Sequence, residues 1–242
     1  MGWLLVALSC RPLLSGSTDE PVDTIHTMCR PWSTHTPQRA CRGPRNGAVA
    51  MGLPELSLAE VTAADVRLCA ELTVAGFYGE LGEDYGFNNN RATAYFELLK
   101  EQREDLVRSL REEGTLHLLA RAGAEAVGFV RVRRVRHSDP LERGVLLDNL
   151  VVRRDARRQG VARRLVREAE ARVRSHGVAQ ELYLLVEQSN EAARAFYASE
   201  GWEELPDAHT DATRYRLDWW RGRVCESCVQ LAMRHRLLDC ES

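Results

Sequence analysis

The chain has 242 residues, of which 44% are hydrophobic and 28% are charged, so its composition is that of an ordinary globular protein with one or two domains. Its 33 basic and 35 acidic residues give a net charge of −2, which disfavours a basic nucleic-acid-binding protein. No apolar run approaches the roughly 18 residues of a transmembrane helix, which disfavours a membrane protein.

The first 53 residues have the composition of a targeting segment. They contain five arginines among scattered Ser, Thr and Pro residues, and no helical or strand period persists. This pattern predicts an organelle transit peptide, for a chloroplast rather than a mitochondrion, although Asp19, Glu20 and Asp23 are more acidic residues than such peptides usually contain. The alternative is a disordered extension without a targeting role on a cytoplasmic protein.

The seven cysteines lie mostly near the two ends of the chain, and only Cys69 falls in the periodic middle. An odd number with this distribution disfavours a secreted disulfide scaffold and predicts a reducing compartment.

Residues 54–220 alternate strand and helix patterns and are predicted to form one α+β domain. The clearest helix covers residues 161–175, where apolar residues recur at helical spacing before Gly177. The unbroken apolar run at 182–186 is typical of a strand buried on both faces. Strands are predicted over 56–61, 115–121, 125–136, 145–152, 182–186, 202–205 and 213–219, and helices over 65–77, 91–113, 161–175 and 190–199.

Residues 221–242 are predicted to be a poorly ordered tail. Cys225 and Cys228, with His235 and Cys240, also resemble a set of zinc ligands. The spacing is loose and no second Cys-x-x-Cys pair follows, so we predict no metal site.

The first chemical signal is the loop between strand 145–152 and helix 161–175, which reads Arg157-Arg158-Gln159-Gly160-Val161-Ala162. A helix N-terminus after a strand offers backbone N–H groups without carbonyl partners, together with positive dipole potential. Residues 153–177 hold nine arginines against three acids, a net charge of +6. The loop is therefore predicted to bind a phosphorylated ligand; a solvated basic helix is the alternative. It is neither a P-loop nor a dinucleotide fingerprint, because it lacks Gly-Lys-Ser/Thr and has a single glycine.

Two segments carry a resemblance to a known family. The sequence Leu147-Asp148-Asn149-Leu150-Val151-Val152, followed by Arg157-x-x-Gly160-x-Ala162, resembles motif A of the GNAT superfamily of N-acetyltransferases. Downstream, Asn190-x-x-Ala193-x-x-Phe196-Tyr197-x-x-x-Gly201-Trp202 resembles its motif B, with Trp where Phe is commoner. The resemblance covers about residues 56–220, and within the superfamily the chain is most similar to plastid and bacterial-type protein acetyltransferases.

This resemblance implies the acyl-CoA N-acyltransferase fold, an α/β/α layered arrangement in which helices flank a mixed central sheet and strand 145–152 splays from strand 181–187. It also implies acetyl-CoA as co-substrate. Implied contacts are Leu150, Val151 and Val152 with the pantetheine; Arg157, Arg158, Gln159, Gly160, Val161, Ala162 and Arg163 with the phosphates; Asn190 with the pantetheine arm; and Tyr197 with the sulfur.

The implied chemistry is direct attack of an amine on the thioester. A backbone N–H near Val151 would stabilise the oxyanion, and Tyr197 would be the general acid for the departing thiolate. A core aromatic is the other interpretation of Tyr197. Some relatives place a glutamate base at the position of Leu146 and others at that of Leu185, but both are leucine here. Asp148, Glu187 or a chain of water molecules remain as the base, and Asp148 is the one we assign a catalytic role.

The charges of two segments favour a cationic acceptor. Residues 55–113 carry 13 acids against six bases, and residues 181–211 carry eight acids against one arginine. The leading hypothesis is N-acetylation of a protein amine, at an N-terminus or a lysine; solvated surface is the other interpretation of these acids. A small-amine acetyltransferase acting on polyamine-like substrates and a non-catalytic acyl-CoA-binding module are the alternatives. Tyr85 and Phe87, in the loop at 78–90, are candidate wall residues on the acceptor side.

Overall fold

The computed structural model describes residues 55–78, 89–135, 144–177, 179–218 and 222–237. The predicted transit peptide at 1–53, the candidate wall residues Tyr85 and Phe87, and Cys240 lie outside these ranges. In the described part of the chain, no helix is both long enough and apolar enough to cross a membrane.

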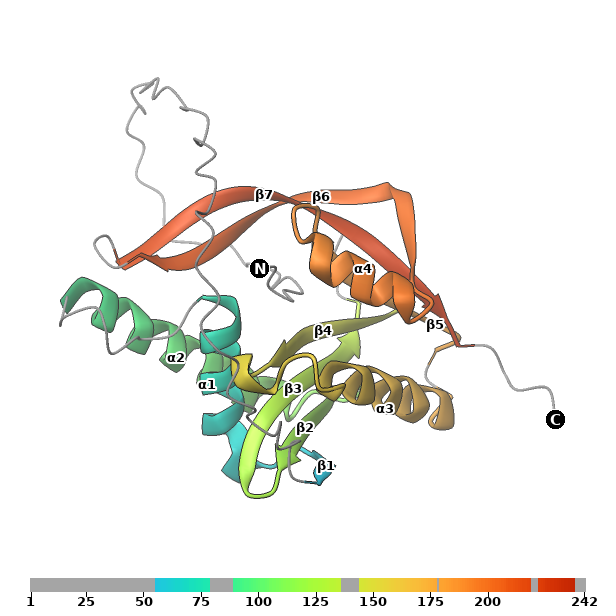
Figure 1. Ribbon diagram of the computed structural model, residues 1–242, viewed down its shortest axis with the longest axis horizontal. Coiled ribbons are helices and arrows are strands. Elements are labelled where there is room, and N and C mark those ends of the chain that lie inside the picture. Colours follow the sequence, from blue (N-terminus) through green and yellow to red (C-terminus); the bar gives the residue numbers. More distant parts are fainter. Residues whose placement is uncertain (1–54, 79–88, 136–143, 178, 219–221, 238–242) are drawn as a thin grey trace, which may run out of the picture. The chain divides into compact units, whose positions relative to one another are not determined.

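Within these ranges, seven strands form one mixed sheet in the order β1-β2-β3-β4-β5-β7-β6 (Figure 1). Neighbouring strands are antiparallel except β4 and β5, which run parallel. The strands are β1 (Leu56–Glu60), β2 (Leu116–Ala122), β3 (Glu125–Arg134), β4 (Val145–Val152), β5 (Glu181–Glu187), β6 (Glu203–Asp218) and β7 (Gly222–Arg236). The main helices are α1 (Val66–Phe77), α2 (Asn89–Ser109), α3 (Val161–Ser175) and α4 (Glu191–Ser199), and short 3-10 turns cover Ala63–Asp65 and Arg154–Ala156.

The helices pack on both faces of the sheet, because side chains alternate between the two faces along each strand. Val130 and Val152 pack with Leu165 of α3, and Ala193 of α4 joins the same core. Phe129 and Val151, one residue away on the same strands, pack instead with α1 and α2. The predicted layered α+β fold is therefore confirmed, and each helix supplies one apolar stripe to one face of the sheet.

The prediction of a poorly ordered tail after residue 220 does not hold for residues 222–236, which form strand β7. It pairs with β5 from Glu181↔Arg236 to Glu187↔Gln230, and with β6 on its other edge. Residues 222–236 therefore complete the sheet. Cys225 and Cys228 are three residues apart on this strand, so their side chains leave opposite faces, which does not suit a shared metal ion.

The extent of strand β6 also differs from the prediction. The two separate strands predicted at 202–205 and 213–219 are one strand with a register irregularity between Glu204 and His209. Pro206 within this stretch has no N–H to donate, which accounts for the break in the sequence pattern.

Candidate active site

Strands β4 and β5 diverge soon after they begin to pair. Their pairing covers Val145↔Leu182 and Leu146↔Tyr183, and no further pair forms between them. From Leu147 onward, the edge of β4 that faces β5 therefore has no strand partner among the described residues. An extended ligand with amide groups can pair with this edge as an added strand would. The predicted splay is confirmed, and Leu150, Val151 and Val152 lie on the diverging part.

A β-bulge shapes the middle of β4. The register jumps from Arg131↔Asp148 to Phe129↔Val151, and Asn149 adopts a positive φ of 53°. Two residues of β4 thus face one of β3, which bends the strand. Because of this extra residue, both Leu147 and Leu150 point into the core with α3.

The loop from β4 to α3 presents backbone N–H groups at a helix N-terminus. The first backbone bond of α3 runs from Arg164 N–H to Gly160 O at 3.0 Å, so the N–H groups of Val161, Ala162 and Arg163 have no acceptor within the helix. Gly160 has φ of 80°, and a Cβ built on it would meet nothing within 4 Å. The backbone conformation thus requires glycine at position 160. The loop also faces open space, in which an anion can bind.

The arginines of this region divide into two groups. Arg157 Nε donates to Val152 O at 2.9 Å, and Arg163 Nε bonds Glu200, so these side chains join elements of the fold. Arg154, Arg158 and Arg164 form no ion pair with any described residue, and all three are exposed. Their charges are available to a phosphorylated ligand, and Arg158 also holds a positive φ of 65° at the turn.

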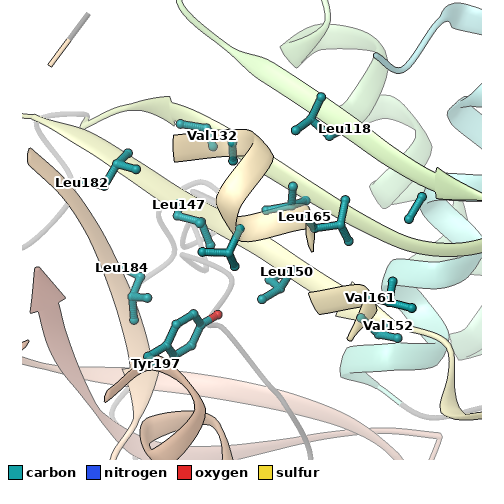
Figure 2. Close-up of a cluster of buried hydrophobic side chains, with 14 of the residues drawn as sticks. Leu118, Val132, Leu147, Leu150, Val152, Val161, Leu165, Leu182, Leu184 and Tyr197 are labelled. Carbon is teal, nitrogen blue, oxygen red and sulfur yellow. The ribbon is translucent and has the colours of Figure 1, made fainter. Parts of the chain in front are cut away.

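Tyr197 of α4 is fully buried on the α3 side of the sheet. Figure 2 shows its hydroxyl pointing toward Leu150 of β4, while Leu184 of β5 lies beside the ring. Within the described ranges, this hydroxyl has no hydrogen-bond partner. Burial raises the pKa of Tyr197 well above its usual value of 10. A buried hydroxyl without a partner is costly, and a ligand atom in the gap between β4 and β5 would satisfy it.

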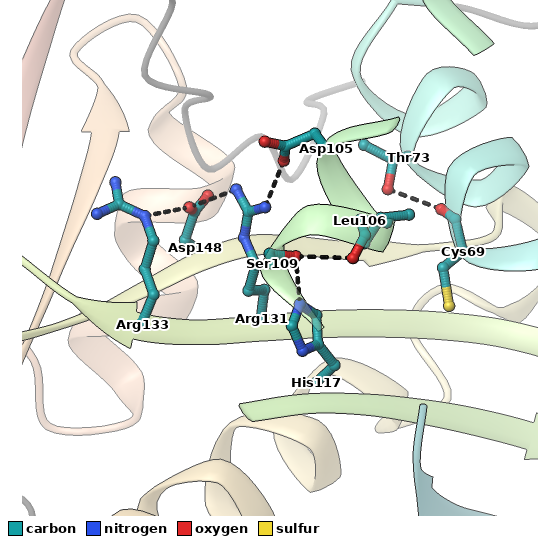
Figure 3. Close-up of polar contacts among 9 residues, drawn as sticks. All are labelled: Cys69, Thr73, Asp105, Leu106, Ser109, His117, Arg131, Arg133 and Asp148. Carbon is teal, nitrogen blue, oxygen red and sulfur yellow. Dashed lines mark hydrogen bonds and ion pairs between the residues drawn. The ribbon is translucent and has the colours of Figure 1, made fainter. Parts of the chain in front are cut away.

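Asp148 lies in a buried ion cluster (Figure 3). Its Oδ2 atom accepts from Arg131 at 2.8 Å and from Arg133 at 2.9 Å, and Arg131 also bonds Asp105 of α2. Burial by itself would raise the pKa of Asp148, but the two arginines outweigh it and lower the pKa below the usual value. A carboxylate with a lowered pKa is a weak base, so the cluster favours a structural role for Asp148.

Asn190 caps the N-terminus of α4, where its Oδ1 accepts from Ala193 N–H at 3.2 Å. Its predicted bond to the pantetheine arm stays a prediction. Gln159, in the phosphate loop, donates from its side chain to Asp155 O at 3.0 Å.

The face of the sheet opposite Tyr197 carries a buried apolar cluster next to the divergence. Leu146, Leu185 and Ala232 pack together there, from β4, β5 and β7. Two buried polar residues, Glu187 and Gln230, are paired in register at the end of this cluster. Gln230 and Ala232 could not be predicted as buried residues of this region, because both lie in the predicted tail. Arg131 and Arg133 could not be predicted either, because arginines that alternate with valine indicate a solvent-exposed strand face.

A comparison with protein-family models matches residues 77–202 to the acetyltransferase (GNAT) family. The chain belongs to the GNAT family. It is therefore an acyltransferase, and acetyl-CoA is the acetyl donor that such enzymes use.

Solved structures share the fold of this GNAT acetyltransferase at low sequence identity. A GNAT-family acetyltransferase from Streptococcus pneumoniae superposes with a TM-score of 0.51 and 17% identity, over 75% of this chain and 99% of that one. The ribosomal-protein-S18-alanine N-acetyltransferase from Escherichia coli gives 0.50 and 17%, over 78% and 98%. A mutant spermidine N-acetyltransferase from Vibrio cholerae gives 0.50 and 14%, over 75% and 94%. The search of curated proteins gave no match.

Proposed function

We propose that this GNAT acetyltransferase transfers the acetyl group of acetyl-CoA to a primary amine of a protein, at an N-terminus or a lysine. The observation that carries acetyl transfer at this site is the buried Tyr197 hydroxyl, which has no partner in the described part of the chain and points toward Leu150 on the diverging part of β4. The N–H groups at the start of α3 would hold the pyrophosphate, and the free edge of β4 would pair with the pantetheine.

The acceptor class is supported by the apolar character of the sheet face opposite Tyr197, where Leu146, Leu185 and Ala232 form a buried cluster. A polyamine carries a charge every few atoms and would need several carboxylates along its path. A single amine on an otherwise neutral peptide suits apolar surroundings better. Enzymes with the same fold are named for protein acceptors and for small-amine acceptors. One neighbour is a ribosomal-protein-S18-alanine N-acetyltransferase, and another is a spermidine N-acetyltransferase. The small-amine alternative therefore stays as the second candidate.

The chain's own groups supply two steps of the reaction. A backbone N–H of β4 near Val151 stabilises the oxyanion that forms when the amine attacks the thioester carbon. Tyr197 then donates its proton to the departing sulfur. Because burial keeps Tyr197 protonated at neutral pH, the proton is available when the C–S bond breaks. The same apolar surroundings disfavour both a thiolate and a tyrosinate. The attacking nitrogen still has a proton to lose after the N–C bond forms, and this proton returns to Tyr197, so no charge is left in the core.

The proposal is tested by incubating the full chain with acetyl-CoA and either a peptide library or a panel of polyamines, followed by mass spectrometry. We expect acetylated peptides, and acetylation of polyamines alone would instead establish the second candidate. In the same assay Tyr197→Phe is expected to lower kcat roughly 100-fold while coenzyme A still binds, since only the proton donor is lost. An unchanged kcat would make Tyr197 a core aromatic only.

The predicted binding of the pyrophosphate at the loop is tested by a substitution that introduces a negatively charged side chain there. Gly160→Glu is expected to weaken coenzyme A binding at least 100-fold or so in calorimetry, because a carboxylate would occupy the pyrophosphate position. Gly177→Glu is the matched control, because Gly177 also has a positive φ, of 60°, and a Cβ there meets nothing within 4 Å. It lies at the opposite end of α3, so its coenzyme A affinity is expected to stay near that of the natural chain. Equal losses in both variants would contradict the placement of the loop.

A further inference from the structure

We propose that Asn149 is a positioning residue for acetyl transfer: its side chain locks the β-bulge of β4 and so directs the N–H of Leu150 at the thioester carbonyl. The inference rests on the proposed function, because it assigns a role within the same site. Asn149 acts through the backbone of the residue that follows it.

Backbone hydrogen bonds beyond the bulge fix which N–H groups of β4 face the gap. Directly after β4, Arg153 N–H donates to Val127 O of β3 at 2.8 Å. Because N–H groups alternate between the two edges of a strand, those of Val152 and Leu150 point away from β3, toward the gap. Arg157 Nε donates to Val152 O, which agrees with a carbonyl that is turned away from β3. The N–H of Leu150 is therefore the first one beyond the bulge that can reach a ligand in the gap.

The bulge also decides which face of the sheet Leu150 occupies. Regular alternation from Leu147 would place Leu150 on the opposite face, but the extra residue returns it to the core that contains Tyr197. The Tyr197 hydroxyl points toward Leu150 (Figure 2). The bulge thus brings an N–H donor for the oxyanion and the proposed proton donor to the same stretch of β4.

The backbone of Asn149 suits this bulge. Its φ of 53° lies in the left-handed region, which asparagine tolerates better than most other residues. Among the non-glycine residues that the structure describes, only Asn149 and Arg158 adopt a positive φ. Glycine would adopt the same φ without steric cost, so the conformation alone does not account for asparagine here.

The side chain of Asn149, which is 1% exposed, provides the lock. In the amide orientation that its partners require, its nitrogen donates to Asp148 Oδ1 at 3.0 Å and its oxygen accepts from Arg131 Nη2 at 3.2 Å. Asp148 and Arg131 are paired in register across β4 and β3, directly before the bulge. Arg131 in turn bonds Asp105 of α2, which anchors the lock to a helix outside the sheet. The amide therefore ties the extra residue to a buried pair that cannot slip without losing several bonds.

The experiment compares the natural chain with Asn149→Gly, which keeps access to positive φ and removes the amide. Acetyl-CoA that is isotopically labelled at the thioester carbonyl is bound without an acceptor, and its carbonyl stretch is measured by infrared spectroscopy. In the natural chain we expect a lower frequency than in free acetyl-CoA, because the Leu150 N–H donates to the carbonyl oxygen. In Asn149→Gly the frequency is expected to return toward the free value. With an acceptor present, kcat is expected to fall about 100-fold while coenzyme A affinity is kept.

Ser109→Ala is the matched control. Ser109 is also a buried polar residue, and its hydroxyl bonds His117 of β2. Its removal is expected to lower stability but to leave the carbonyl frequency and kcat near those of the natural chain. A general loss of stability is thereby separated from a displaced N–H group.

An unchanged carbonyl frequency or a natural kcat in Asn149→Gly would overturn this inference alone, because acetyl transfer itself would continue. A natural chain that binds acetyl-CoA but acetylates no amine would overturn the proposed function, while the carbonyl frequency would still test Asn149. If Asn149→Gly fails to fold, Asn149→Ser decides the matter. Its short hydroxyl cannot span both partners, so a raised carbonyl frequency is expected, and the natural frequency would count against Asn149.

Discussion

Asp148 shows how one side chain can hold three elements together. Its carboxylate bonds two arginines of β3, and Arg131 extends the cluster to Asp105 of α2. Asp148, Arg131 and Arg133 are each 5% exposed or less, so water cannot replace a lost partner. Removing one member of a buried ion pair leaves the others charged and unpaired, which costs more than the pair contributes.

We therefore predict that Asp148→Asn lowers the free energy of unfolding by about 3–5 kcal/mol, measured by urea denaturation. The remaining activity of folded protein is expected to keep the natural pH profile. As a control, Glu125→Gln breaks an exposed pair with Arg153 and is expected to change stability little. A fully stable Asp148→Asn variant with a shifted pH profile would restore Asp148 as the base.

At the scale of elements, α1 packs tightly against β4 at a glycine. A Cβ on Gly76 of α1 would lie 2.1 Å from Cγ2 of Val151. Val151 lies on the diverging part of β4, so the position of α1 is linked directly to the strand edge that would hold the pantetheine. This contact explains a glycine inside a helix, where glycine is otherwise unfavourable.

The contact between Gly76 and Val151 is tested by whether Gly76→Ala raises or lowers the free energy of unfolding. In an ordinary helix interior, Gly→Ala stabilises by up to about 1 kcal/mol. For Gly76→Ala we expect the reverse, a loss of about 1–3 kcal/mol from overpacking, measured by chemical denaturation. Adding Val151→Ala makes room for the new methyl group, so the double variant is expected to be more stable than the sum of the two single losses predicts. Strict additivity would mean that the two residues do not share this space.

At the scale of the whole molecule, stability is expected to depend on the protonation of a buried histidine. His117 is 4% exposed, bonds the Ser109 hydroxyl at 2.8 Å and stacks on Phe129. Burial, together with the charge of Arg131, lowers the pKa of His117 from 6.5 to about 4. The unfolded chain thus binds a proton at a pH where the folded chain does not.

It follows that the free energy of unfolding is highest above pH 6.5 and falls by about 3 kcal/mol as the pH drops from 6.5 to about 4. His117→Gln, which has no group that titrates in this range, is expected to show a shallower decline when urea denaturation is repeated across the window. Equal slopes for the two proteins would rule out His117 as the source.

Much of this molecule could be predicted from its sequence, because the signals involved are local. The apolar stripe of 161–175 depends only on helical spacing, and the helix is observed with those bounds. The Gly160 loop was recognisable because a strand and a helix flank it. The buried role of Arg131 and Arg133 was not, because it depends on Asp148 of another strand. The order of the last two strands depends on pairing with β5, which no short window of sequence contains.

The place of β7 between β5 and β6 has a consequence for how the protein is made. Strands β1 to β4 each pair with the next strand along the chain, so this half can assemble while translation continues. In contrast, β5 emerges from the ribosome with an open edge that only residues 222–236 can cover. Gln230 and Ala232, which lie beside Glu187 and Leu185, arrive with that strand. The nascent enzyme therefore completes the sheet beside β5 last, and the exposed edge of β5 invites wrong pairing until then.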